Sequence, residues 1–383
     1  MMMSMKADNK KWLATVFNAA ASRLGVSMSL AKKAVIISHY SLFIFILCAC
    51  STIDDDLSAC GNEYELDYEL RLVTNMTTEL QTVLETQTEV PIANALRAHL
   101  ADIFTDYAHD VDLSFYDTQG DSLRLHHDKH IMDANQASYT LFLPMREYQH
   151  LAVANVVNNP IVGIAEDERC HTSMLHQTVN DTIPSHTTGL FTARQPMEVL
   201  EGVDQTFNVR LYMANCAAAL VIDPRDHDIS NLRVFTTGFA KQFNICDSIY
   251  LFADKDPLVR TERIKAEQSD LTAYCSVNFP SREADDDEVS GSVASRRTVI
   301  ETEEPFISQP GDHVLWKFVV FQKTSEGKIT LTELGLRRPL RAGQLKIVKC
   351  YVNDDGSITT DDMTVGVSVT LDWHDGGTYN PEL

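Results

Sequence analysis

Short segments that are either apolar throughout or alternate between apolar and polar residues fill most of the chain after Arg194, and they restrict the possible folds more than any other feature. Alternation with a period of two residues is typical of a strand with one buried face. Turn-forming stretches such as "SEGK" (325–328) and "NDDGS" (353–357) separate the segments. Many short strands with few helices predict a mainly β fold of antiparallel sandwiches.

The part of the chain before Arg194 contains strands and one helix. "YELDYELRL" (64–72) alternates without a break, which predicts a half-buried strand, and strand patterns return at 111–117 and 138–144. Between them, "PIANALRAHLADIFTDYAHD" (91–110) changes to a helical period. Its apolar stripe consists of Ile92, Leu96, Leu100, Ile103, Phe104 and Tyr107.

These patterns predict two domains with a boundary near Gln205. The first, at 61–205, contains the helix, and the second, at 206–383, contains the denser strands. Inside the second domain, "SREADDDEVSGSVASRR" (281–297) combines runs of charge with small residues and has no apolar period. We expect this stretch to be an exposed acidic loop.

The last predicted strand, "MTVGVSVTLDW", has the most regular alternation in the chain. Two interpretations remain open. The strand can close its own sheet, or it can pair with the open edge of another subunit, as in strand-addition assemblies. The residues on its apolar face are the candidates for contact with a partner: Met363, Val365, Val367, Val369, Leu371 and Trp373.

Near the N-terminus, Lys32 and Lys33 precede a 16-residue apolar run at 34–49 that ends at Cys50. As a helix, this run reaches about 24 Å, which is short of the roughly 30 Å hydrocarbon core of a bilayer. A basic start, a short apolar middle and a small residue before the cysteine are typical of a bacterial lipoprotein signal peptide. We therefore predict removal of residues 1–49, lipidation of Cys50 and an acidic tether at 50–60.

Two details of this N-terminal segment stay open. An uncleaved membrane anchor, or a cysteine that follows a core helix by chance, is the alternative to lipidation. Starting at Met28 gives a short basic n-region of ordinary length, so we predict Met28 as the true start.

The charge of the chain excludes one class of partner. The formal net charge is -22, and removal of residues 1–49 takes away six basic residues and one acidic residue, leaving -27. Binding to nucleic acid requires a basic face for phosphate, so we expect no nucleic acid partner. A chain this acidic is held at a membrane by its lipid and not by a polybasic patch.

The cysteines after Cys50 show no C-x-x-C spacing, which leaves a zinc ribbon or a thioredoxin motif unsupported. An exported chain can oxidise its thiols, and six cysteines allow 15 complete pairings. We expect most of them to be buried free thiols, because several lie on predicted strands. They are Cys60, Cys170, Cys216, Cys246, Cys275 and Cys350.

Few residues suggest chemistry. "LHHDKH" places His126, His127, Asp128 and His130 close together, which fits either a metal site or a solvated hairpin, and we favour the hairpin. Ser325 and Lys328 match S-x-x-K, but they lie in a turn and lack the companion motifs of that enzyme class. No phosphate-binding, zinc-protease or nucleophile-elbow motif occurs. We expect no enzyme, no metal, no cofactor beyond the lipid and no small-molecule substrate.

Seven segments of the chain point to one protein family. They are "CSTIDDDLSACGNEYELDYELRLVTNMTTEL" (50–80), "REYQHLAVANVVNN" (146–159), "GLFTAR" (189–194), "FNVRLYMANCAAALVID" (207–223), "LWKFVVF" (315–321), "PLRAGQLKIVKCYV" (339–352) and "TVGVSVTLDWHDGG" (364–377). They resemble the fimbrial anchor subunits of Bacteroides-type (type V) pili.

This resemblance implies two tandem transthyretin-like antiparallel β-sandwich domains. It implies a lipoprotein of the outer membrane and cell surface, with diacylglycerol and an N-acyl chain on Cys50. Asp54, Asp55 and Asp56 resemble a surface-export signal of such bacteria. The implied role is non-catalytic: the subunit tethers a polymerised pilin at the base of the fimbrium and limits its assembly. Because type V pilins insert a C-terminal segment into a neighbour, Met363–Trp373 is the candidate donor.

A surface glycan-binding lipoprotein is the alternative function. Such a protein requires exposed aromatic side chains that stack on sugars, and the chain has three tryptophans. Trp12 precedes Cys50 and is removed with the signal peptide. Trp316 and Trp373 lie on apolar strand faces, which favours burial in a core over sugar binding.

Overall fold

The structure is a computed structural model that describes most of the chain after Asn62. It divides the chain into Met1–Asn62 and Glu63–Leu383, and all described residues belong to the second unit. The predicted signal peptide, Cys50 and the tether lie outside the described residues. These are 63–73, 77–78, 83–105, 108–131, 138–165, 168–178, 182–283, 294–296, 314–323, 329–362 and 365–370.

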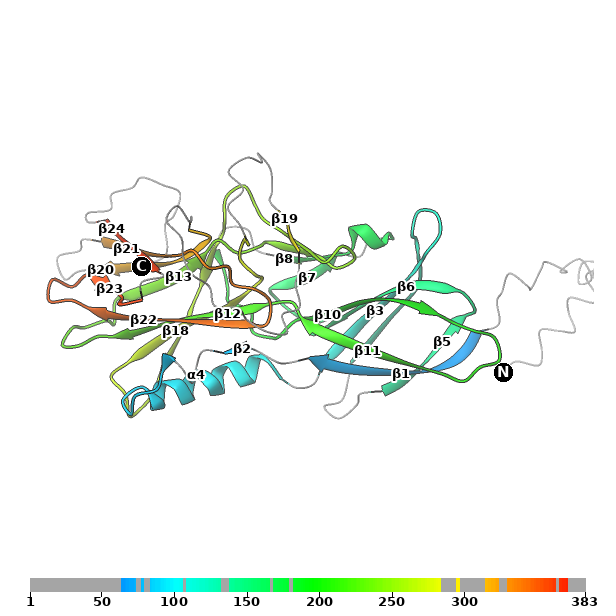
Figure 1. Ribbon diagram of the computed structural model, residues 1–383, viewed down its shortest axis with the longest axis horizontal. Helices are drawn as coiled ribbons and strands as arrows, with labels where there is room; N and C mark the ends of the chain where they lie inside the picture. Colours follow the sequence, from blue (N-terminus) through cyan, green and yellow to red (C-terminus); the bar gives the residue numbers. More distant parts are fainter. Residues whose placement is uncertain are drawn as a thin grey trace, which may run out of the picture. The chain divides into compact units, whose positions relative to one another are not determined.

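The described residues are mainly β, as predicted, with one α-helix and one short 3-10 helix (Figure 1). The first strand of the unit lies in a seven-stranded sheet. In sheet order, the strands of this sheet are β4 (Arg124–Ile131), β3 (Asp110–Asp117), β6 (Glu147–Ala154), β10 (Phe191–Glu198), β11 (Gln205–Met213), β1 (Glu63–Val73) and β5 (Ser138–Pro144).

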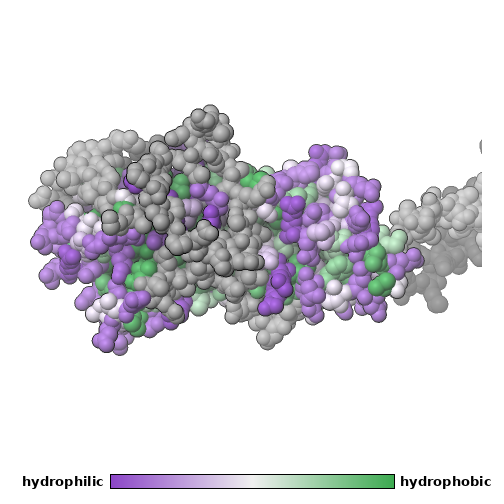
Figure 2. Space-filling view, viewed as in Figure 1, coloured by the Kyte–Doolittle hydropathy of each residue, from purple (hydrophilic) through white to green (hydrophobic). Residues whose placement is uncertain are grey.

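Strand β1 confirms the alternation in the sequence. Leu66, Tyr68 and Leu70 are buried, whereas the acidic residues between them are exposed. The strand runs parallel to β11 and antiparallel to β5. In the space-filling view, the surface over the strands at the right of Figure 1 is mostly hydrophilic, with small apolar patches (Figure 2).

Two further sheets, formed mostly by strands from the second half of the unit, pack face to face. The first contains β17 (Glu262–Lys265), β18 (Thr272–Asn278), β12 (Cys216–Asp223), β22 (Gln344–Val352) and β2 (Thr77–Thr78), and β23 (Ile358–Thr359) pairs with β22. The second contains β24 (Val365–Thr370), β21 (Ile329–Leu336), β20 (Trp316–Lys323), β13 (Leu232–Thr237), β16 (Leu258–Arg260) and β9 (Thr182–Ile183). One apolar cluster contains alternate residues of both sheets, including Leu220, Phe318 and Val348. Such interdigitation is typical of a β-sandwich core.

The predicted helix forms as α4 (Val90–Ile103) and ends before the predicted residue. Its stripe is buried at Ile92, Leu96, Leu100 and Ile103, while Tyr107 lies outside the described residues. The helix packs on the outer face of β12, β18 and β22, and not on the sheet of β1. This differs from the expectation that it belongs to the N-terminal domain. The physical reason is that the face formed by Ala217, Ala219 and Ile347 is apolar and needs cover.

The domain boundary near Gln205 stays a prediction. Gln205 begins β11, which pairs in register with β1, so the chain returns to the first sheet at this point. Strand β2 pairs with β22, and β9 pairs with β16. Elements on both sides of the predicted boundary therefore share sheets.

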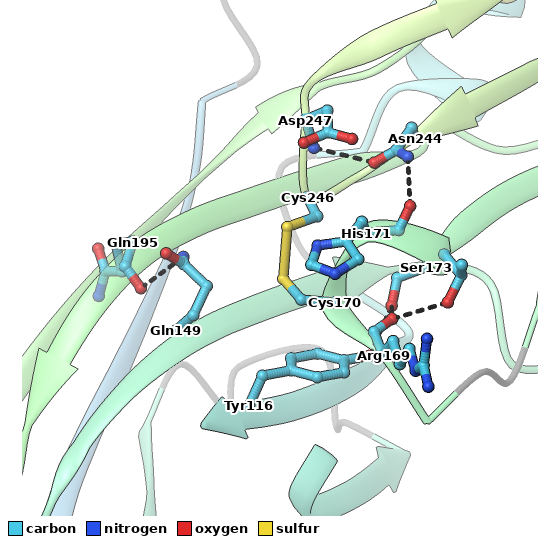
Figure 3. The surroundings of a disulfide bond; sticks show 11 residues. Tyr116, Gln149, Arg169, Cys170, His171, Ser173, Gln195, Asn244, Cys246 and Asp247 are labelled. Carbon is cyan, nitrogen blue, oxygen red and sulfur yellow. Dashed lines mark hydrogen bonds between the residues drawn. A yellow bond between two sulfur atoms is a disulfide. The ribbon is translucent and has the colours of Figure 1, made fainter. Parts of the chain in front are cut away.

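A five-stranded sheet lies against the seven-stranded one through a shared apolar cluster. Its strands are β19 (Ala294–Arg296), β15 (Ile249–Leu251), β14 (Gln242–Asn244), β8 (Met174–Gln177) and β7 (Val162–Ala165). The short helix η1 (Cys170–Thr172) precedes β8. A disulfide joins Cys170 to Cys246, with the Cα atoms 5.7 Å apart, and links η1 to the turn after β14 (Figure 3).

The other cysteines of the described residues are free, as expected for most of them. Cys216, Cys275 and Cys350 are buried, and burial raises the pKa of all three thiols, that of Cys350 to about 12. At neutral pH these groups are therefore thiols and not nucleophilic thiolates. Cys60 lies outside the described residues.

The prediction of an exposed loop at 281–297 was wrong at its ends. Ser281 is 1% exposed, because its N–H donates to the carbonyl of Leu340 and its hydroxyl accepts the Leu340 N–H. At the other end, Ala294–Arg296 forms β19 and pairs with β15. Residues 284–293 lie outside the described part of the chain.

Candidate functional site

The predicted C-terminal strand forms as β24, the first strand in the order of its sheet (Figure 1). It pairs antiparallel with β21 of the same chain, from Val365 opposite Leu336 to Thr370 opposite Leu331. The first of the two open interpretations, a strand that closes its own sheet, therefore describes this structure. Among the described residues, no other strand pairs with β24.

The candidate contact residues are only partly described. Val365 is 8% exposed and belongs to the sandwich core. Val367 lies opposite Leu334, and Val369 lies opposite Thr332. Met363, Leu371 and Trp373 lie outside the described residues.

The hydrogen-bond pattern shows which backbone groups of β24 point away from β21. The N–H of Val365 donates to Asp362 O, and the carbonyl of Leu336 accepts the N–H of Leu315, so this opposed pair does not exchange hydrogen bonds. Bonded and non-bonded pairs alternate along an antiparallel ladder. The N–H groups of Val367 and Val369 therefore point toward the free edge.

The start of β24 is fixed by contacts with β22. Asp362 forms an ion pair with Lys346 at 3.7 Å, and its N–H donates to the Thr360 hydroxyl at 3.1 Å. The same hydroxyl donates to the carbonyl of Lys349 at 2.6 Å. Because these contacts precede the strand, the free edge has a defined position before any partner binds.

The histidine group does not assemble a metal site. His127 bonds to Asp112 at 3.0 Å, and His130 bonds to Asp128 at 2.9 Å. Strand β4 divides the group, because His127 lies on one face with Asp112, and His126, Asp128 and His130 lie on the other. Within the described ranges, no group of three or more potential ligands could hold a metal ion.

Trp316 is a core residue, as its apolar strand face predicts. It is 1% exposed, and its indole N–H donates to the Arg338 carbonyl at 3.0 Å. Trp373, Ser325 and Lys328 lie outside the described residues. No helix among the described residues is both long and apolar enough to cross a membrane.

No family model matches the chain, and neither does any curated protein sequence. Among solved structures, a DUF1812 protein from Bacteroides thetaiotaomicron is 11% identical with a TM-score of 0.48, covering 79% of this chain and 97% of that one. The fimbrial anchor protein Mfa2 from Porphyromonas gingivalis is 11% identical with a TM-score of 0.44, covering 81% and 99%. The tip fimbrial protein Mfa3 from the same organism is 11% identical with a TM-score of 0.39, covering 81% and 100%. These likenesses are too weak to assign a function to this chain.

Proposed function

We propose that this chain is a non-enzymatic fimbrial subunit, anchored by lipid in the outer membrane, that tethers a polymerised pilin through β-strand pairing and limits its assembly. The observation that carries the proposal is the edge of β24, the last described strand, which no other described strand covers. An unpaired edge is a template for a strand of another chain, and main-chain hydrogen bonds supply the affinity. The family resemblance of the sequence supports the same role.

Pairing at this edge is tested with a change that acts on the backbone. In Val369→Pro, the outward N–H is lost and the ring obstructs a neighbouring strand, while the bonds from β24 to β21 are kept. We expect the amount of pilin cross-linked to this subunit on intact cells to fall about tenfold. Mass spectrometry of the captured proteins measures it.

Val369→Ala is the matched control, because it shortens the same side chain and keeps the N–H. It should capture pilin as the unchanged protein does. Truncation after Asp362 is a poorer test, since it also removes Val365 from the core. Equal capture by Val369→Pro and Val369→Ala contradicts pairing at this edge. If the unchanged protein captures no pilin, the anchor proposal fails and glycan binding becomes the next hypothesis.

Lipid anchoring at Cys50 is a separate part of the proposal. In Cys50→Ala, the thiol that would carry the diacylglycerol is absent, so the protein should leave the membrane fraction. Immunoblotting of membrane and soluble fractions measures the distribution. Cys60→Ala, ten residues later in the sequence, is the control and should stay with the membrane. Membrane retention of Cys50→Ala contradicts anchoring through this residue.

A further inference from the structure

Three arginines lie side by side on the outer face of the seven-stranded sheet. Arg71 on β1 pairs in register with Arg210 on the parallel strand β11. Strand β10 pairs with β11 at Phe191–Met213 and Thr192–Tyr212, and beyond these two pairs Arg194 and Arg210 line the same hollow. Paired strands are about 4.8 Å apart, so Arg71 and Arg210 are direct neighbours, and Arg194 adds a third like charge beside the hollow.

No described side chain forms an ion pair that neutralises this row. All three arginines are exposed, and no side-chain ion pair or hydrogen bond to them forms in the described part of the chain. Glu69 lies on the same face of β1, two residues before Arg71 and opposite Asn208. Like charges on directly opposed strand residues destabilise a sheet. In a chain with a net charge of -22, an unpaired arginine row therefore indicates an external anion.

A hollow of about 890 Å³ contains two of these arginines, Arg194 and Arg210. Its other lining residues are mainly neutral and polar, among them Gln149, Asn208 and Ser248. Amide and hydroxyl side chains both donate and accept hydrogen bonds, so they match the hydroxyl groups of a sugar. The half-buried ring of Tyr212 adds an aromatic face.

The rim of the hollow is held in place without a ligand. The amide of Gln149 donates to the Gln195 carbonyl at 3.2 Å. Ser248 belongs to a turn in which the Asp247 N–H donates to the Asn244 side chain at 2.9 Å, and the Asn244 amide donates to the His171 carbonyl at 2.7 Å. The disulfide ties this turn to η1 (Figure 3). A site positioned in this way loses little conformational entropy on binding.

We propose that the arginine row and its hollow bind an acidic saccharide, a glycan that carries carboxylate groups. The planar fork of arginine fits a carboxylate with two parallel hydrogen bonds, and the neutral lining accommodates the sugar hydroxyls. An acidic peptide fits less well, because Pro196 is the sole aliphatic side chain among the lining residues. The proposal does not depend on fimbrial tethering, since β24 belongs to a different sheet.

Binding of the full chain to polygalacturonate at low salt tests the proposal, with affinity gel electrophoresis as the measurement. Arg194→Gln and Arg210→Gln should each weaken the apparent affinity by about tenfold, because a charge-assisted bidentate contact is lost. Arg260→Gln makes the same change of charge at an exposed position on β16 and should keep the affinity. The unfolding temperature of Arg210→Gln should equal or slightly exceed that of the unchanged protein, because repulsion in the row falls.

Two further polymers distinguish a saccharide site from a surface that binds any polyanion or any polysaccharide. Neutral dextran should not bind, and polyglutamate, which carries carboxylates without sugar hydroxyls, should bind at least about tenfold more weakly than polygalacturonate. Equal binding of polyglutamate overturns the assignment of a saccharide. The whole proposal is overturned if polygalacturonate does not bind, if dextran binds equally well, or if the two arginine variants bind like Arg260→Gln.

Discussion

The free energy of unfolding is expected to fall by about 4 kcal/mol between pH 8 and pH 5, because two buried histidines are neutral in the folded chain. Burial lowers the pKa of His150 to about 4 and that of His186 to about 3. In the unfolded chain both side chains take up a proton near pH 6.5. The two neutral histidines therefore make their full contribution to the free energy of unfolding above pH 6.5, and this contribution is lost as the pH falls toward the pKa values of the folded chain.

The contacts of both rings explain why the charged form is excluded. The Nδ1–H of His150 donates to the Ser114 carbonyl at 3.1 Å, so Nε2 is free to accept the hydroxyl of Tyr68. The ring also stacks on Phe115, with centroids 4.3 Å apart. His186 packs edge-on against Phe279, and its Nδ1 has no hydrogen-bond partner in the described structure. A proton on either ring would place an unpaired charge in an apolar interior.

His186→Leu isolates one of the two histidines. The change removes one titrating group, so the slope of unfolding free energy between pH 6 and pH 5 should halve, from about 2.5 to about 1.3 kcal/mol per pH unit. Urea unfolding at a series of pH values measures it. Phe279→Leu is the control, because it alters the packing around the same ring and keeps the histidine; its slope should stay unchanged. An unaltered slope in His186→Leu would show that His186 is not the source.

The local elements follow from the order of residues along the chain. The alternation of 64–72 predicts β1, and the alternation after Asp362 predicts β24, because each pattern depends only on neighbouring residues. The helical stripe from Ile92 to Ile103 is likewise local, and its burial agrees with the structure. The end of the helix is less well predicted, since Phe104 leaves the helical conformation and the chain turns into β3.

Contacts between distant segments were not predictable in this way. The pairing of β1 with β11 joins residues more than a hundred positions apart, and no single pattern specifies that partner. The same limit applies to the disulfide, whose cysteines are 76 residues apart, and to the sheet that α4 covers. The arginine row is visible only once the register is known. A basic residue on the polar side of each of three strands is the signal, but it has no meaning before the strands are ordered.

Strand β24, the candidate for pairing with a partner, shows the same division between what neighbouring residues specify and what distant residues specify. The alternation predicts that the segment is a strand, but the identity of its neighbour depends on the rest of the sheet. The structure adds the direction of the N–H groups, which follows from hydrogen bonds at Val365 and Leu336. That direction makes a backbone test of Val369 possible, which the apolar pattern alone does not provide.

Trp316→Ala is expected to lower the free energy of unfolding by about 3 to 5 kcal/mol, because it removes a large side chain from the sandwich core. Trp316 packs against Phe239 and Phe318, with ring centroids 5.4 Å away in both cases. The change also leaves the Arg338 carbonyl without the indole N–H. Denaturant unfolding of the full chain measures the loss.

Phe142→Ala is the control for this measurement, because Phe142 is an aromatic strand residue that is 51% exposed. Its effect should stay within about 0.5 kcal/mol. If Trp316→Ala costs as little as Phe142→Ala, Trp316 is not a core residue and becomes available as a stacking surface for sugars. The expected large loss instead removes it from the candidates for glycan binding, because a ring that is 1% exposed cannot meet a sugar without opening the sandwich.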